Sequence, residues 1–386
     1  MVFPTKPVKR VTMHLLLRWK TGTAWFDDAC LSVLQGATNS YLLDGGFYKP
    51  PAPEAVGSIK DPVHLENTSG LGLTLDGATG EVCEVLVNGQ ELPLARRGGF
   101  FARDVAAGGA AHWFRGVVHR TSGDQVTFEG ACEPLGLTLT ATLDATGPAI
   151  YAQGEVRDST GKPRAITVYF GLPVDAEGWR FCEQADQSRP IESADDYGRF
   201  TRCGAGALGQ HSIYPLAPVA GPVGLAVGVP MEAPQLWRGR YDGAAKELQV
   251  ALDFGLLPTH RRYPSRAPFD FSLFTFRPEW DFRGALEAYY RVYPASFTKR
   301  TDQSGLWMAF TDISTVQQPE DFGFMFHEGN NNVAWDDAHD ILSFVYTEPT
   351  SFWINLPKDY SRELGPVVEE VERRADGGDR GAQFAL

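Results

Sequence analysis

Apolar and polar residues alternate along most of the chain between residues 65 and 278. Leu71, Leu73 and Leu75 alternate with small or polar residues and precede an Asp-Gly pair at 76–77. A period of two places apolar side chains on one face of a strand, and such pairs are typical of hairpin turns. The pattern predicts further strands over 82–87, 113–119, 126–129, 137–143, 150–156, 165–172, 211–214, 224–229, 236–241, 247–254 and 269–276, with an irregular stretch at 179–202. So many strands without a helix predict two packed sheets, a large antiparallel β-supersandwich.

The period of the apolar positions changes from 2 to 3.6 after residue 280. In the segment 281–293, five apolar positions fall at i, i+3, i+4, i+7 and i+10: Phe282, Ala285, Leu286, Tyr289 and Val292. This spacing predicts one amphipathic helix. Asp281 stands where a capping carboxylate would accept the first free N–H groups, and Pro294 would end the helix.

Two short apolar runs follow, at 305–310 and 341–346. Each has the length of a parallel strand buried on both faces, and a long polar loop separates them. With a helix-like segment at 363–374, they predict the opening of a β/α layout. The predicted fold class is therefore mainly β, in four parts: an irregular N-terminal arm (1–64), the β-supersandwich (65–278), a linker helix (279–303) and a partial, TIM-barrel-like β/α segment (304–386).

Composition narrows the possible partners. The 386 residues are 43% hydrophobic and carry a formal charge of −13, which argues against nucleic acid as a partner because phosphates are bound by clustered Lys and Arg. We expect a neutral or cationic ligand. Nine Trp, thirteen Tyr and twenty-four Phe offer flat faces that suit sugar rings, although an aromatic core accounts for them equally well.

Targeting and cofactor signals are weak or missing. No run approaches the roughly 18 apolar residues of a membrane span, and Arg18 and Lys20 interrupt the only candidate signal-peptide core. The expectation is a cytoplasmic protein without a membrane partner. The five cysteines form no C-x-x-C pair. The acidic cluster at 336–340 matches no defined metal-binding loop, so neither a metal nor a cofactor is predicted.

Several segments resemble a known arrangement. Residues 164–174 with Gly178-Trp179, 212–216 and 224–229 resemble the galactose-mutarotase-like sandwich of large glycoside hydrolases. Residues 269–274, 280–283 and 288–294 resemble the linker helix that leads into a (β/α)8 barrel in relatives of the alpha-galactosidase and alpha-glucosidase clan. The resemblance covers roughly 65–360 and implies a glycoside hydrolase. Because a complete barrel needs about 200 to 250 residues, segment 304–386 implies a truncated form of one.

Candidate chemistry lies after residue 304. In β/α folds the active site forms at the carboxyl ends of the strands, and Asp312 and Glu348 follow the two apolar runs. Glycoside cleavage needs two carboxyl groups, for which Glu328, Glu348 and Asp312 are the predicted catalytic residues. The predicted substrate-binding residues are polar or aromatic and lie in or beside the same region: Trp307, His327, Asn331, Trp335, Asp336 and Asp337. The alternative is that Asp312 and Asp336 cap turns or helices and that Glu348 only ends a strand.

Two other functions stay open. A non-catalytic carbohydrate-binding or structural sandwich fits the incomplete barrel. A mutarotase-like sugar epimerase would need a carboxylate and a histidine on the concave face of the sandwich, and the candidate histidines are His112, His119, His211 and His260. In each case the partner is a carbohydrate, and exposed strands of an unfinished barrel predict a homo-oligomer.

Overall fold

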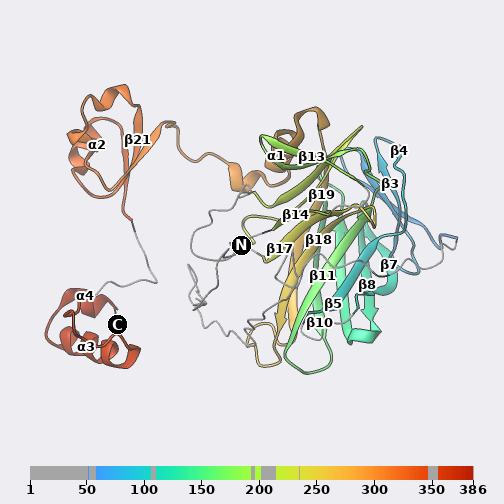
Figure 1. Ribbon diagram of the computed structural model, residues 1–386, viewed down its shortest axis with the longest axis horizontal. Helices are drawn as coiled ribbons and strands as arrows, with labels where there is room; N and C mark the ends of the chain where they lie inside the picture. The colour runs from blue at the N-terminus through green and yellow to red at the C-terminus, as the bar shows by residue number, and fades with distance from the viewer. Residues whose placement is uncertain are drawn as a thin grey trace, which may run out of the picture. The chain divides into compact units, whose positions relative to one another are not determined.

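The structure is a computed structural model that describes residues 51, 58–105, 110–192, 196–200, 214–233, 235–346 and 355–385. Most of the predicted N-terminal arm lies outside these residues. The described chain divides into two compact units, the first ending at Thr298 and the second beginning at Lys299 (Figure 1). In the described part, no helix is both long and apolar enough to span a membrane.

Three antiparallel sheets build the first unit. The four-stranded sheet has the order β1-β2-β3-β4, the nine-stranded sheet β13-β12-β15-β16-β19-β10-β9-β8-β7, and the six-stranded sheet β14-β17-β18-β11-β5-β6. The strands are β1 (Val63–Glu66), β2 (Leu71–Leu75), β3 (Val82–Val87), β4 (Gln90–Glu91), β5 (Gly99–Asp104), β6 (His112–Trp113), β7 (Arg115–Ser122), β8 (Gln125–Cys132), β9 (Leu137–Asp144), β10 (Ile150–Asp158), β11 (Arg164–Pro173), β12 (Arg180–Gln184), β13 (Gln187–Pro190), β14 (Asp196–Phe200), β15 (Leu216–Ala220), β16 (Gly224–Gly228), β17 (Trp237–Asp242), β18 (Glu247–Leu256) and β19 (Arg266–Phe276).

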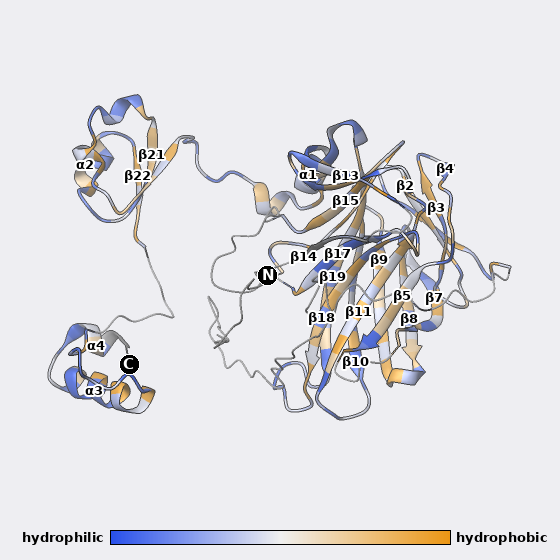
Figure 2. Ribbon diagram, viewed as in Figure 1, coloured by the Kyte–Doolittle hydropathy of each residue, from blue (hydrophilic) through white to orange (hydrophobic). Residues whose placement is uncertain are grey.

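The hydrophobic core lies between the nine-stranded and six-stranded sheets. Phe100 on β5 contacts Phe269 and Phe271 on β19, with ring centroids 5.9 and 6.1 Å apart. All three rings are buried, and each contributes about 1.5–3 kcal/mol through removal from water. The apolar residues of each strand supply this core, as the hydropathy colouring of the strands illustrates (Figure 2). The sandwich part of the predicted fold class is confirmed.

One stretch of the sandwich is more regular than its sequence suggests. Residues 179–202, predicted to be irregular, include the hairpin β12–β13 and the strand β14. The hairpin was missed because β13 lies at the edge of its sheet and is mostly polar, so no apolar alternation marks it. The predicted strand at 211–214 falls almost entirely outside the described residues.

Helix α1 (Asp281–Val292) covers part of the outer face of the nine-stranded sheet. Its apolar stripe, including Phe282 and Tyr289, packs with Phe274 of β19 in a second hydrophobic cluster. The helix was predicted, but the capping role of Asp281 is wrong. Trp280 is the N-cap residue, and the Asp281 carboxylate instead accepts hydrogen bonds from Arg180 Nε at 2.9 Å and Ser188 Oγ at 2.9 Å. A charge-assisted bond to arginine outcompetes the backbone N–H groups.

The second unit contains a three-stranded parallel sheet and the helices α2, α3 and α4. Strands β20 (Leu306–Ala309), β21 (Phe324–Glu328) and β22 (Leu342–Phe344) pair in that order, with α2 (Val333–Ala338) between the last two. Helices α3 (Leu364–Asp376) and α4 (Arg380–Ala385) follow.

Short 3-10 helices occur in both units. Those of the first unit are Glu133–Leu135, Pro278–Trp280 and Pro294–Phe297, and those of the second are Ile313–Thr315 and Pro319–Asp321.

Both apolar runs are parallel strands, so the β/α character of this segment is confirmed, whereas its likeness to a TIM barrel stays a prediction. The prediction that they are buried on both faces is wrong. Leu306, Trp307 and Phe344 are 52%, 53% and 45% exposed, because α2 covers only one face of the sheet in the described residues. Strand β21 was predicted to be loop, since its sequence ends in the polar pair His327-Glu328 and carries only three apolar residues.

Candidate functional site

The candidate site is the carboxyl-terminal edge of the parallel sheet. Strand β20 leads to Asp312, and β21 ends at Glu328. Glu348 follows β22 in the sequence but lies outside the described residues. Parallel strands end at a common edge, so side chains from separate segments of the chain meet there.

Strand register divides the predicted residues between two faces of this sheet. Met308, His327 and Ser343 are register partners, and so are Ala309, Glu328 and Phe344 in the next row. Because successive side chains in a strand point to opposite faces, His327 and Glu328 point in opposite directions. The predicted site is therefore two separate groups of residues.

The first face is covered by α2 and contains a buried polar network. His327 Nδ1 lies 2.6 Å from Asp336 Oδ2, and Ser343 Oγ donates a hydrogen bond of 2.6 Å to the same oxygen. An ionised carboxylate can only accept, so the imidazole nitrogen is the donor. His327 is 0% and Asp336 1% exposed. The network joins β21, α2 and β22, and a sugar could reach it only if α2 moved.

The second face is exposed and mostly apolar. Glu328 shares it with Phe344 in its own row and with Trp307, Phe326 and Leu342, whose row lies two residues earlier along each strand. The Glu328 carboxylate is half-buried and makes no ion pair or hydrogen bond with any described residue. A carboxylate beside exposed aromatic rings is a combination that can bind a sugar, since rings pack against its C–H groups while the carboxylate accepts from its hydroxyls.

The Asp312 side chain caps a local 3-10 turn. Its Oδ1 accepts hydrogen bonds from Ser314 N at 3.0 Å and Ser314 Oγ at 2.6 Å, which caps the 3-10 helix Ile313–Thr315. The bond from the Ser314 hydroxyl lowers the pKa of Asp312, so this group is held as a carboxylate rather than as a proton donor. For Asp312, the structure therefore agrees with the alternative prediction that it caps a turn.

Asn331 and Asn332 bond to the segment that contains this turn. Asn331 Nδ2 donates to the carbonyl oxygen of Phe310 at 2.6 Å, and Asn332 Nδ2 donates to Ser314 Oγ at 3.1 Å. On α2, Trp335 stacks on His339 with centroids 3.8 Å apart, and Asp337 is exposed. In the described residues no three His, Cys, Asp or Glu side chains gather closely enough to hold a metal ion.

Sequence reasoning missed Ser343 and the division into two faces. The signal was present as alternation: Phe324, Phe326 and Glu328 are spaced by two and fall on one face. This alternation was too short to distinguish a strand from a loop, because the segment is five residues long and lies between Gly323 and the run Gly329-Asn-Asn-Asn332.

The epimerase alternative needs a histidine beside a carboxylate on the sandwich. His112, His119 and His260 form no ion pair or hydrogen bond with a carboxylate within the described residues, and His211 lies outside them. The six-stranded sheet buries the carboxylates of Asp242 and Glu247, but arginines are their charged partners: Arg240 lies 2.7 Å from Asp242 and Arg96 lies 3.5 Å from Glu247. Burial raises the pKa of Glu247 to about 7.

Comparisons with known proteins find only distant structural likeness. No family model matches this chain, and no curated protein matches it. A GH36 alpha-galactosidase from Geobacillus stearothermophilus is 11% identical with a TM-score of 0.43, over 64% of this chain and 45% of that one. A putative aldose 1-epimerase from Escherichia coli is 11% identical with a TM-score of 0.36, over 55% and 98%.

A protein from Synechocystis is also similar, at 13% identity and a TM-score of 0.36, over 57% of this chain and 99% of that one. The present chain thus spans less than half of the alpha-galactosidase. Likeness this distant carries no conclusion about the activity of the chain.

Proposed function

We propose that the protein is a glycoside hydrolase, or the part of one that carries Glu328 as one of its two catalytic carboxyl groups. One observation supports this assignment most directly. Glu328 ends the middle strand of a parallel sheet, on the face that α2 leaves open, and its carboxylate has no partner among the described residues. The carboxylates of Asp312 and Asp336, by contrast, accept hydrogen bonds within the fold.

The proposed chemistry needs a second carboxyl group nearby. One group, held protonated, gives its proton to the glycosidic oxygen as the bond to the anomeric carbon breaks, and the other either attacks that carbon or takes a proton from water. Glu348 is the proposed partner, since it follows β22, the strand next to β21.

Aromatic residues on the open face would hold the sugar. Trp307 and Phe344 are exposed on that face, where their rings can pack against the apolar side of a pyranose. His327 and Asp336 support the site from behind, because their buried bond fixes the strand on which Glu328 sits.

The test is turnover of a panel of aryl α- and β-glycosides by the wild type, Glu328→Gln and Glu91→Gln. Gln has nearly the shape of Glu but cannot transfer a proton or act as a nucleophile. We expect Glu328→Gln to lower turnover by a factor of about 100 to 10,000 with unchanged melting temperature, while Glu91→Gln, which changes an exposed carboxylate of the four-stranded sheet, keeps full activity. A wild type that cleaves no member of the panel, or a Glu328→Gln variant that cleaves as fast as wild type, would overturn the proposal.

A further inference from the structure

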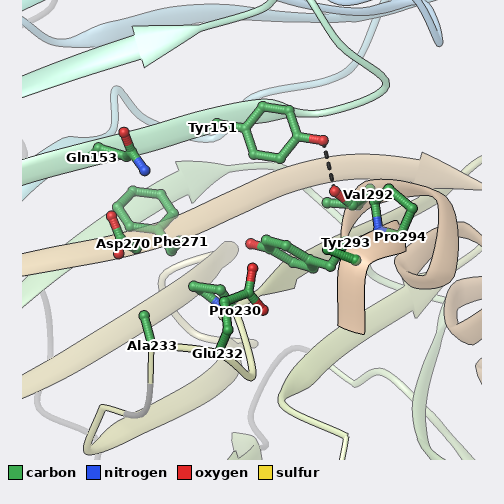
Figure 3. A pocket seen from close by; sticks show the side chains of 11 residues that line it. Tyr151, Gln153, Pro230, Glu232, Ala233, Asp270, Phe271, Val292, Tyr293 and Pro294 are labelled. Carbon is green, nitrogen blue, oxygen red and sulfur yellow. Dashed lines mark hydrogen bonds between the residues drawn. The ribbon is translucent and has the colours of Figure 1, made fainter. Parts of the chain in front are cut away.

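A cavity of about 370 Å³ opens on the outer face of the nine-stranded sheet, far from the parallel sheet in sequence (Figure 3). Phe271 of β19 points into the sandwich core, so its neighbour Asp270 points outward. The side chains that form the cavity are Tyr151 and Gln153 of β10, Asp270 of β19, Glu232 from the loop after β16, and Tyr293 and Pro294 at the end of α1. All belong to the first unit.

The walls of this cavity are held in place by bonds that need no ligand. Tyr151 Oη donates to the carbonyl oxygen of Val292 at 2.9 Å, which fixes the Tyr151 ring against the end of α1. The rings of Tyr151 and Tyr293 lie 6.2 Å apart at 78°. Gln153 and Asp270 are register partners on adjacent strands. The cavity is thus preformed, which lowers the entropic cost of binding.

The charged groups around the cavity are both carboxylates, Asp270 and Glu232. Asp270 is half-buried; burial raises its pKa, a hydrogen bond from Gln153 opposes this shift, and the nearby Glu232 charge adds to it. Glu232 Oε2 already accepts a hydrogen bond of 2.7 Å from Ser296 Oγ. No Lys, Arg or His stands among the described lining residues. An anion would be repelled, and the ligand must supply donors.

From this geometry we infer that the cavity binds one neutral sugar ring, whose hydroxyl groups donate to Asp270 and Glu232 while its C–H face packs on Tyr151. The volume suits a small ligand, near the lower end of the usual range of about 300 to 1,000 Å³. A sugar is favoured over a compact cation because the cavity is much larger than a metal ion and the rings of Tyr151 and Tyr293 line it beside the two carboxylates. The inference goes beyond the proposed hydrolase site and does not depend on Glu328.

The experiment is saturation-transfer NMR and calorimetric titration of the full chain with methyl glucosides, galactosides and mannosides, and separately with tetramethylammonium. We expect at least one glycoside to bind the wild type in the millimolar range. Asp270→Ala should weaken that binding about tenfold to hundredfold, since a hydrogen bond to a charged acceptor is lost. Tyr151→Leu, which removes the ring, should weaken it as well.

Two controls make the result specific. Glu91→Ala removes an exposed carboxylate from the four-stranded sheet and should leave binding unchanged. Tyr151→Phe keeps the ring and should bind more tightly than Tyr151→Leu. Binding of tetramethylammonium without any glycoside, no glycoside binding by the wild type, or glycoside binding unaffected by Asp270→Ala would each overturn the inference.

Discussion

Replacing Asp336 by alanine tests whether the His327–Asp336–Ser343 network holds the parallel sheet together. The substitution removes the one oxygen that accepts from both His327 Nδ1 and Ser343 Oγ. Backbone bonds of α2 do not depend on the side chain, since His339 N and Ile341 N donate to the Asp336 carbonyl oxygen. The substitution therefore affects only the two donors, His327 and Ser343, and the space that the Asp336 side chain fills.

The magnitude follows from the burial of those donors. His327 is fully buried and cannot turn to water, so its unmet N–H costs about 1–3 kcal/mol, while the half-buried Ser343 hydroxyl can find water and costs less. Together we expect a loss of about 2–4 kcal/mol in the free energy of opening of the sheet. Asp336→Asn keeps one acceptor oxygen and should lose about half as much.

Hydrogen exchange of the amides in β21 is the suitable assay, because it reports opening of this sheet separately from the sandwich. A loss of about 2–4 kcal/mol speeds exchange about 30- to 1,000-fold, up to complete loss of protection. Asp337→Ala changes an exposed carboxylate on the same helix and should alter exchange little. If Asp336→Ala exchanged no faster than Asp337→Ala, the network would not stabilise the sheet and the reasoning would be refuted.

Two further predictions concern ion pairs of the sandwich. Arg164 donates to Asp104 at 2.8 Å and to the fully buried Asp158 at 2.8 Å, so Arg164→Met should cost about 3–5 kcal/mol in urea unfolding of the first unit; a loss under about 1 kcal/mol would contradict this. Burial alone would raise the pKa of Asp281, but hydrogen bonds from Arg180 and Ser188 hold it below its usual value. A lowered folded pKa adds stability above the unfolded value and loses it as pH falls through the folded one. The wild type should therefore be more stable than Asp281→Asn by about 1 kcal/mol at pH 7, and the difference should disappear as the pH falls through the lowered folded pKa of Asp281; a difference independent of pH would count against the bond.

Local pattern alone determined most strands of the sandwich. Apolar alternation at 71–75, 137–143 and 165–172 matches β2, β9 and β11 within a few residues, because a strand with one face in the core must place an apolar side chain at every second position. The 3.6-residue period likewise located α1. The hairpin at 180–190 was missed because its second strand, β13, lies at the edge of the sheet and is mostly polar, so it shows no apolar alternation.

Tertiary structure alone decided which groups meet. The sequence places His327 beside Glu328, yet strand pleating sends one under α2 to Asp336 and the other to the open face. It likewise separates Tyr151 from Asp270 by many strands, yet β10 and β19 pair side by side and bring both to one cavity. Register and pairing arise from contacts between distant segments, and no local period encodes them. The types of side chain available for chemistry can be read from the chain, but their partners follow from the packing of the sheets.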